Sequence, residues 1–132
     1  MVQIKSVGVI GAGQMGSGIA HVCALGGYDV LLHDISEERV KQGISTIEKN
    51  LARQVSRGLI EPAAMEAAMK RIQPAPELQS IGKTDLAIEA ATEDEEVKKA
   101  IFKALTPHLS DTAILASNTS SISITRLASA TD

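Results

Sequence analysis

Hydrophobic and polar positions follow two spacings along the 132 residues of this chain, and the two spacings alternate. Short apolar runs bounded by glycine, proline or polar residues predict buried strands at Ile4–Ile10, Tyr28–His33, Asp85–Ala90 and Ala113–Ala116. Between these runs, apolar residues recur three and four positions apart, as on one face of a helix. Strands that alternate with helices form parallel sheets with crossover connections, so the pattern predicts an α/β fold built on a doubly wound parallel sheet.

Capping residues, glycines and prolines mark the expected ends of the helices. We expect helices over Gln14–Leu25, from Ser36 to about Gly58, from Pro62 to about Ile72, from Thr92 to about Pro107, and from about Ile122 to Ala128. The side chains predicted to face the core are Met15, Ile19, Val22 and Cys23 in the first helix, Val40, Ile44, Ile47, Leu51 and Val55 in the second, and Val97, Ile101 and Leu105 in the fourth. The length suits a single domain, and no linker-like segment divides it.

A glycine pattern lies between the first strand and the first helix. Gly11, Gly13 and Gly16 spell G-x-G-x-x-G, which is typical of a Rossmann-like dinucleotide site. The first glycine allows a tight turn, the second lets the backbone approach a pyrophosphate, and the third lets helix and strand pack closely. Because the following helix presents unpaired N–H groups, we expect Gly11–Gly16, including Ala12, Gln14 and Met15, to bind a cofactor. An ordinary structural turn is the alternative.

Asp34 follows the second predicted strand, where such folds place an acid that accepts hydrogen bonds from the adenosine ribose. A carboxylate there would repel a 2′-phosphate, and no arginine follows directly to receive one. The sequence therefore favours NAD over NADP. Asp34 could also help to start the next helix, and the two interpretations are compatible.

Other polar residues follow the later strands. Glu89 and Glu93 lie at or just after the third predicted strand, and Ser117–Ser120 follow the fourth. The carboxyl ends of parallel strands share one edge of a sheet, so these residues should converge on the glycine turn. Taken singly, Ser120 could cap a helix, Asn118 could be a turn residue and Glu93 could decorate a first helical turn.

Lys49, Arg53 and Arg57 are spaced four apart and share one face of the long second helix. A solvated charged face is one interpretation. The other is a docking strip for a phosphate-bearing substrate.

Composition excludes several other functions. The net charge is −3 and aromatic residues make up 2% of the chain, which argues against nucleic-acid binding. Cys23 is the single cysteine, and no apolar run is long enough to span a bilayer, so we expect a cytoplasmic protein without a membrane partner. Neither His21, His33 nor His108 has an acid partner that spacing predicts, and no cluster has metal-ligand spacing.

These residues resemble the N-terminal domain of the NAD-dependent 3-hydroxyacyl-CoA dehydrogenases, of the 3-hydroxybutyryl-CoA dehydrogenase type. The stretches that carry the resemblance are VGVIGAGQMGSGIA, LLHDIS, AIEAATEDEEVKKAIFKAL and AILASNTSSISIT. The resemblance implies that NAD is the cofactor and that a short-chain 3-hydroxyacyl-CoA is interconverted with its 3-oxoacyl-CoA, in fatty-acid or butanoate metabolism.

The resemblance also implies roles for individual residues. Asp34 would hold the adenosine ribose, while Glu93 and Lys98 would contact the cofactor on its nicotinamide side. Asn118 and Ser120 would meet the nicotinamide ribose and the C3 oxygen of the substrate, which makes them the catalytic candidates. The CoA portion would be held by Asn50, Arg53 and Arg57.

In the family, a histidine–glutamate pair transfers the proton, and a C-terminal helical domain completes the substrate cleft and forms a homodimer. This sequence shows neither, so we expect residues 1–132 to be an NAD-binding domain, truncated before the last strands, that binds NAD weakly and is inactive alone. A non-catalytic NAD-binding or structural protein, or another β-hydroxyacid dehydrogenase, are the alternatives.

Overall fold

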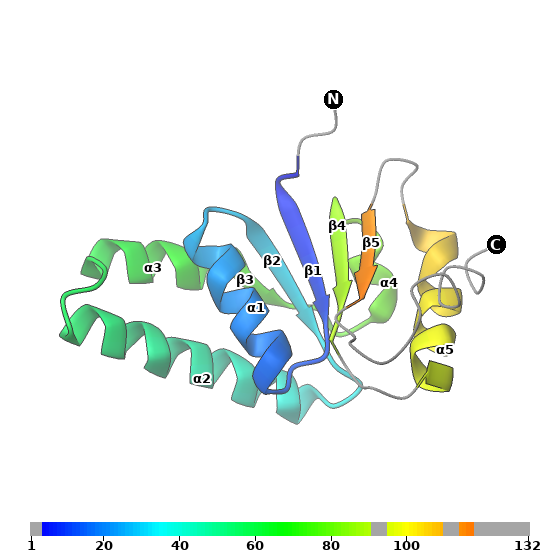
Figure 1. Cartoon of the computed structure of the whole chain (residues 1–132), viewed down its shortest axis with the longest axis horizontal. Coiled ribbons are helices and arrows are strands. Elements are labelled where there is room, and N and C mark those ends of the chain that lie inside the picture. The colour runs from blue at the N-terminus through cyan, green and yellow to red at the C-terminus, as the bar shows by residue number, and fades with distance from the viewer. Residues whose placement is uncertain (1–3, 91–94, 110–113, 118–132) are drawn as a thin grey trace.

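Five parallel strands form the centre of the molecule, in a computed structural model that describes residues 4–90, 95–109 and 114–117. The strands are β1 (Ser6–Ile10), β2 (Asp29–His33), β3 (Ile72–Pro74), β4 (Leu86–Glu89) and β5 (Ile114–Ser117). Their order in the sheet is β3-β2-β1-β4-β5, and each neighbouring pair is parallel (Figure 1). The order runs outward in both directions from the boundary between β1 and β4, so the predicted doubly wound α/β fold is confirmed.

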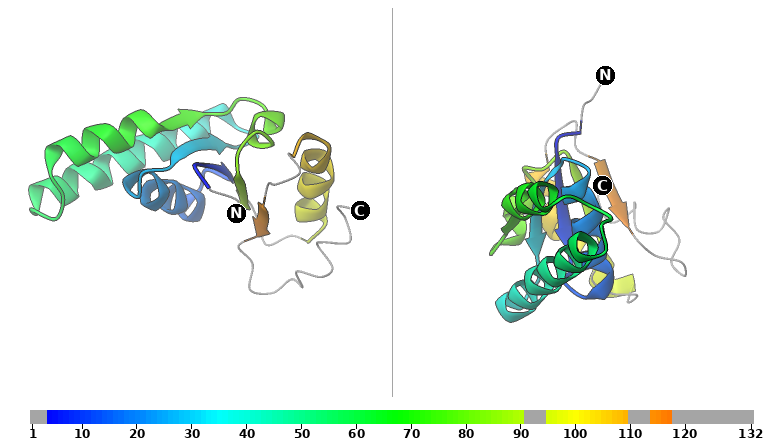
Figure 2. Two further views of the ribbon diagram at one scale, coloured as in Figure 1. Left: turned by 90° about the horizontal axis from the view of Figure 1, so that it is seen from above. Right: turned by 90° about the vertical axis from the view of Figure 1, so that its left-hand side faces the viewer.

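Helices cover both faces of this sheet (Figures 1 and 2). They are α1 (Gln14–Leu25), α2 (Glu37–Ser56), α3 (Pro62–Arg71), α4 (Leu78–Ile81) and α5 (Glu95–Leu105), followed by a short 3₁₀ turn, η1 (Thr106–His108). One buried cluster joins α1, α2 and α3 to the sheet, and a second joins α4 and α5 to the opposite face.

Strand periodicity explains how one sheet supports two cores. Val30 and Leu32 of β2 face the α1–α3 side, whereas Leu31 between them packs against the α4–α5 side. On β1 the same alternation puts Gly8 under α4, where an added Cβ would lie 2.6 Å from Cγ2 of Ile81. This glycine therefore allows a close approach of helix to sheet.

The predicted helix boundaries agree with the observed ones wherever the structure describes them. Ser36 caps α2 as expected, because its hydroxyl accepts a hydrogen bond from the Arg39 N–H at 3.3 Å. Pro62 opens α3. The predicted helix over 122–128 and the capping role of Thr92 lie outside the described residues.

Three side chains predicted to face the core are in fact exposed: Met15 by 55%, Val22 by 69% and Val97 by 45%. On α1 the buried face is instead made by small residues, Gly16, Ser17, Ala20 and Ala24. Small side chains allow the helix to lie close to the sheet, and a hydrophobicity pattern gives them little weight. For this helix face the prediction was therefore wrong at Met15 and Val22, whereas Ile19 and Cys23 pack against the core as predicted.

Two short elements were not predicted. β3 has three residues and ends at Pro74, and α4 has four. Proline is tolerated in β3 because this strand lies at the edge of the sheet, where one side needs no ladder hydrogen bonds.

The amino-terminal edge of the sheet is held by one carboxylate. Oδ2 of Asp85 accepts hydrogen bonds from the backbone N–H groups of Lys5 at 2.9 Å and Ser6 at 3.1 Å. These bonds hold the pKa of Asp85 below its ordinary value. A second long-range contact joins α3 to α1, where Nη1 of Arg71 donates to the Ala24 carbonyl at 2.8 Å.

Candidate functional site

The three glycines of the G-x-G-x-x-G turn have different structural roles. Gly11 adopts φ = 111°, a left-handed conformation that disfavours any side chain, and its N–H donates to the His33 carbonyl at 2.7 Å. A Cβ on Gly16 would lie 1.7 Å from the Gly11 carbonyl oxygen, so helix α1 can meet the turn only without a side chain. A Cβ on Gly13 would meet nothing within 4 Å. The protein itself therefore does not require glycine there, which fits close approach by a ligand.

Asp34 lies at the carboxyl end of β2 and holds the glycine turn in place. Its Oδ2 accepts a hydrogen bond from the Ala12 N–H at 3.0 Å, and its Oδ1 accepts one from the Ser36 N–H at 3.1 Å. A carboxylate offers about four acceptor positions, so these two bonds leave capacity for ribose hydroxyls. The half-buried carboxylate can thus position both the turn and a ligand.

A cavity of about 270 Å³ lies beside Asp34. Its lining includes Gly11, Asp34, Ile35, Arg39, Val97 and Ile101, from β2, α2, α5 and the glycine turn. Ile35 is 99% exposed, which is unusual for an isoleucine, and it lines this cavity together with the half-exposed Val97. Apolar walls beside a carboxylate suit a flat heterocycle whose attached sugar meets Asp34. The sequence did not predict Ile35, Arg39 and Val97 as site residues, because they lie on three separate segments that meet only in the folded protein.

A larger groove of about 460 Å³ separates α1 from α2. Uncharged polar residues line most of it: Gln14, Ser17, His21, Gln42, Thr46 and Asn50. Gly43 lets the helices meet at one point, because a Cβ there would lie 2.7 Å from Oγ of Ser17. The groove runs from Gly13 of the turn to Asn50, so the structure brings together two residues that the sequence analysis assigned to different ligands.

Arg53 and Arg57 lie beyond the groove. Both are exposed, Arg53 in the last turn of α2 and Arg57 at its C-cap. Neither lines the groove itself, but they follow Asn50 along the same helix. The three predicted CoA residues therefore extend outward along α2 from the groove.

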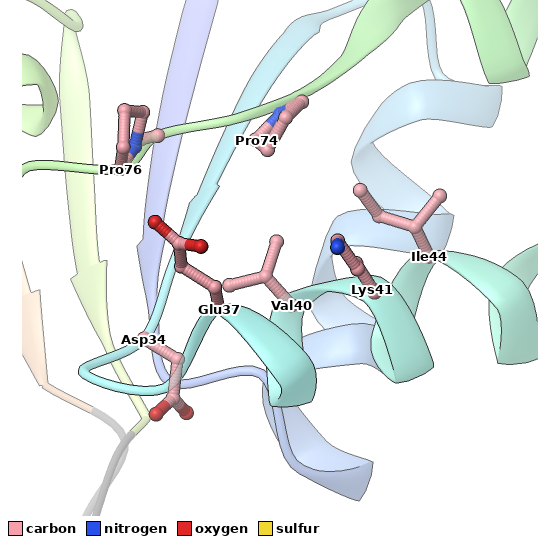
Figure 3. Close-up of a pocket in the computed structure, with 8 residues that line it drawn as sticks. Asp34, Glu37, Val40, Lys41, Ile44, Pro74 and Pro76 are labelled. Atoms are coloured by element: carbon pink, nitrogen blue, oxygen red, sulfur yellow. The ribbon is translucent and has the colours of Figure 1, made fainter.

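A further cavity of about 250 Å³ lies between α2 and the segment that follows β3 (Figure 3). Glu37, Val40 and Ile44 face Pro74 and Pro76 across it. Asp34 is at its rim, but its carboxylate turns away, consistent with its hydrogen bond to Ala12. The carboxylate of Asp34 is thus better placed for the cavity that contains Ile35.

At the end of β4, Glu89 forms an ion pair with Lys98 of α5. Both side chains have an exposed fraction of 0%. Most lysines on helices face solvent, but Lys98 does not. In the sheet register, Glu89 lies opposite Ile10 of β1 on one side and Ser117 of β5 on the other. The pair therefore lies between the glycine turn and the end of β5, the strand that precedes Asn118.

The remaining predicted site residues, Glu93, Asn118 and Ser120, lie outside the described residues, so their roles stay predictions. Met15, assigned to the glycine turn, is exposed at the start of α1. No group of histidine, cysteine or acidic residues within the described part of the chain could hold a metal ion.

The histidines and the cysteine have structural contacts. Nδ1 of the buried His33 donates to the Ala75 carbonyl at 2.7 Å, and Nε2 of His21 pairs with Oε1 of Gln54 at 3.0 Å. His108 is exposed in η1. Burial raises the pKa of the Cys23 thiol, which packs against the α1–α3 core. A raised pKa disfavours the thiolate, so Cys23 is not set up as a nucleophile.

Similar proteins were found by sequence and by structure. Residues 6–132 match a family model described as 3-hydroxyacyl-CoA dehydrogenase, NAD binding domain. A 3-hydroxybutyryl-CoA dehydrogenase from Bradyrhizobium diazoefficiens is 57% identical over 129 residues, which are 98% of this chain and 44% of that protein.

Two crystal structures of 3-hydroxybutyryl-CoA dehydrogenases are also similar to this chain. The (S)-3-hydroxybutyryl-CoA dehydrogenase PaaH1 from Ralstonia eutropha has a TM-score of 0.94 and 40% identity, covering 98% of this chain and 46% of that one. A 3-hydroxybutyryl-CoA dehydrogenase from Escherichia coli has a TM-score of 0.93 and 42% identity, covering 96% of this chain and 27% of that one. The chain thus spans less than half the length of each of these relatives.

Proposed function

Because this chain belongs to the family of NAD-binding domains of 3-hydroxyacyl-CoA dehydrogenases, we propose that it serves the NAD-dependent interconversion of 3-hydroxyacyl-CoA and 3-oxoacyl-CoA. NAD is the cofactor of this family. In the proposed reaction the chain supplies the cofactor site and part of the CoA site, and the substrate is short, of the 3-hydroxybutyryl-CoA kind named for the relatives.

The groove between α1 and α2 is the observation that carries the acyl-CoA part of this proposal. It begins at Gly13, beside the proposed pyrophosphate position, and reaches Asn50. Its uncharged polar lining suits the two amides of a pantetheine arm, which carry no charge. Arg53 and Arg57 follow on the same helix, where guanidinium groups can bind the phosphates of CoA.

The proposed reaction gives each of the other candidate residues a role. Oxidation of the substrate moves a hydride to the nicotinamide and a proton from the hydroxyl to a base. The glycine turn and Asp34 would hold the cofactor, with Glu93 and Lys98 on its nicotinamide side. Asn118 and Ser120 would orient the C3 oxygen of the substrate. Proton transfer in the family is assigned to a histidine–glutamate pair that these 132 residues do not match, so we expect the chain by itself to turn over little acetoacetyl-CoA.

The proposal extends to the metabolic setting of the reaction and to the cell compartment and assembly of the protein. Relatives include subunits named for a fatty acid oxidation complex, which favours fatty-acid metabolism, and the short substrate adds butanoate metabolism. We propose a cytoplasmic homodimer that binds neither nucleic acid nor membranes. None of the described helices combines the length and the apolar composition that spanning a bilayer requires.

Binding of acetoacetyl-CoA by the 132-residue chain tests the proposal. We expect Arg53→Ala/Arg57→Ala to weaken this binding by about tenfold or more, because two charge-assisted contacts to phosphate are lost. Isothermal calorimetry in the presence of NAD gives the affinities. Lys103→Ala, which removes an exposed cation at the end of α5, is the matched control and should leave the affinity unchanged.

The same titration separates the alternatives. A non-catalytic NAD-binding protein would bind NAD but not acetoacetyl-CoA. Another β-hydroxyacid dehydrogenase would have no need of the arginines, so its substrate affinity would be the same in the double variant. Either result would contradict the acyl-CoA assignment. NADH oxidation by the chain at the rate of a complete dehydrogenase would contradict the expectation of little turnover.

A further inference from the structure

Stability alone does not explain the Glu89–Lys98 pair. Both side chains are fully buried, and the desolvation cost of a buried ion pair often equals or exceeds the attraction between its charges. Apolar residues of similar volume are frequently as stable or more stable in such positions. A buried pair at this place in the fold therefore invites an explanation from the chemistry beside it.

The pair lies where a dinucleotide crosses the sheet. Dinucleotides bind outside the carboxyl ends of the strands, at the point where the strand order reverses, and that point is the boundary between β1 and β4. Glu89 ends β4 and lies opposite Ile10, the residue before the glycine turn. Asp34 and the apolar cavity place the adenosine half on the β2 side. The nicotinamide half must then extend over β4, on the side of the pair.

Charge distinguishes the two redox forms of the cofactor at this location. The nicotinamide ring carries a positive charge in NAD⁺ and none in NADH, whereas the adenosine half is the same in both. A fixed charge near the ring therefore changes the ratio of the two affinities, and burial strengthens the effect because water screens it less. A closely paired carboxylate and ammonium exert a much smaller field than either charge alone.

We propose that the Glu89–Lys98 pair determines the relative affinity for NAD⁺ and NADH by keeping the buried charge beneath the nicotinamide balanced. Each residue affects the affinity ratio by neutralising the charge of the other. A balanced pair lets the site hold both redox forms, which a reversible hydride transfer requires. This inference rests on the cofactor half of the proposed function and is independent of the acyl-CoA half.

Opposite single substitutions test the proposal on the 132-residue chain. Lys98→Met removes the positive charge beside Glu89 and should shift the affinity ratio toward NAD⁺ by about tenfold. Glu89→Gln leaves Lys98 without its counter-charge and should shift the ratio toward NADH by a similar factor. Calorimetry gives the dissociation constant for NAD⁺, and fluorescence of the reduced nicotinamide gives the constant for NADH.

The pH of each measurement is chosen so that the buried group that remains in the variant stays charged. A buried carboxylate keeps its charge best at higher pH, and a buried ammonium keeps its charge best at lower pH. Lys98→Met is therefore measured near pH 8.5 and Glu89→Gln near pH 6. The wild-type chain is measured at both pH values.

The ratio remains informative even if a single variant is partly unfolded. A reduced fraction of competent protein weakens the apparent affinity for both ligands by the same factor, so it cancels. The double variant Glu89→Gln/Lys98→Met removes both charges and should return the ratio to the wild-type value. Lys99→Met, one position along α5 and partly exposed, makes the same charge change outside the buried pair and should leave the ratio unaltered.

The outcomes are distinct. Shifts of opposite sign in the single variants, with recovery in the double variant, support the proposal. Ratios that stay at the wild-type value, or shift in one direction in both single variants, overturn it while the cofactor assignment stands. A wild-type chain that binds neither NAD⁺ nor NADH overturns the proposed cofactor role, and this inference with it.

Discussion

The two sides of the proposed cofactor edge present different kinds of groups to a ligand. On the β1–β2 side, the glycine turn and Asp34 form a network of backbone N–H groups and one half-buried carboxylate. On the β4 side, the described residues present a fully buried ion pair between Glu89 and Lys98. The first side is built from groups that accept or donate single hydrogen bonds. The second is built from charges that act at a distance.

This difference matters for what each side can discriminate. The adenosine half is identical in NAD⁺ and NADH, so the β1–β2 side can set overall affinity but not redox preference. In the proposed binding mode, only the β4 side meets the part of the cofactor whose charge changes. Substitutions on the two sides should therefore separate affinity from redox preference.

The largest effect is expected from Gly16→Ala, on the β1–β2 side. Its new Cβ would lie 1.7 Å from a backbone oxygen, which a rotamer change cannot relieve, so α1 must move. We expect the melting temperature to fall by more than about 10 °C, measured by circular dichroism.

Gly13→Ala is the matched control within the same turn. Nothing lies within 4 Å of its new Cβ, so the melting temperature should stay near that of the wild type while NAD affinity falls. Equal melting temperatures for Gly16→Ala and the wild-type chain would show that the close packing of Gly16 against Gly11 does not determine the conformation of the turn.

Asp34→Ala should have an intermediate effect that is equal for both redox forms. Loss of the carboxylate removes the ribose contacts and the bond to Ala12, so NAD⁺ and NADH should each bind about tenfold more weakly. Calorimetry and nicotinamide fluorescence measure the two constants. Glu38→Ala, in the first turn of α2 and not in the cavity, should change neither. A change in the ratio of the NAD⁺ and NADH affinities would contradict the proposal that only the β4 side sets redox preference.

The smallest effect is expected at the opposite edge of the sheet, from Asp85→Asn. Hydrogen bonds from Lys5 and Ser6 lower the pKa of Asp85 in the folded state. A lowered pKa means that the stabilisation is present above the unfolded-state pKa of about 3.9 and is lost as the pH falls through the folded-state pKa. We therefore expect a small decrease in melting temperature at pH 7 that disappears under acidic conditions near pH 2.

Thermal melts across this pH range provide the measurement for Asp85→Asn. The exposed Glu66→Gln on α3 is the control and should follow the wild-type profile. NAD affinity should be unaffected, because Asp85 precedes β4 whereas the proposed cofactor position is at the other end of that strand. Weaker NAD binding in Asp85→Asn would contradict that separation.

Local patterns in the sequence predicted most of the fold. The strands at β1, β2 and β4 and the helices α1, α2 and α3 were predicted because each depends on residues close in sequence. β3 was missed because three residues ending in proline carry too little pattern. The exposed positions on α1 were misassigned because its buried face consists of Gly16, Ser17, Ala20 and Ala24.

The candidate site was predictable only in part. The glycine turn and Asp34 follow from a short motif with a fixed chain order, and the structure brings them together. The cavity with Ile35 and Val97 depends on two elements that meet only in the fold. The burial of Lys98 likewise depends on where α5 packs against β4, and no spacing rule distinguishes it from the neighbouring Lys99.

The bond between Arg71 and the Ala24 carbonyl has a consequence for ligand binding. Helix α1 is fixed at its start by the contact of Gly16 with Gly11, and near its end by this guanidinium from α3. A helix held at both ends has few orientations left to lose when an anion docks at its first turn. If an anion binds at that turn, as proposed, less entropy would be lost in ordering the helix, which is how preorganisation raises affinity without adding a contact to the ligand.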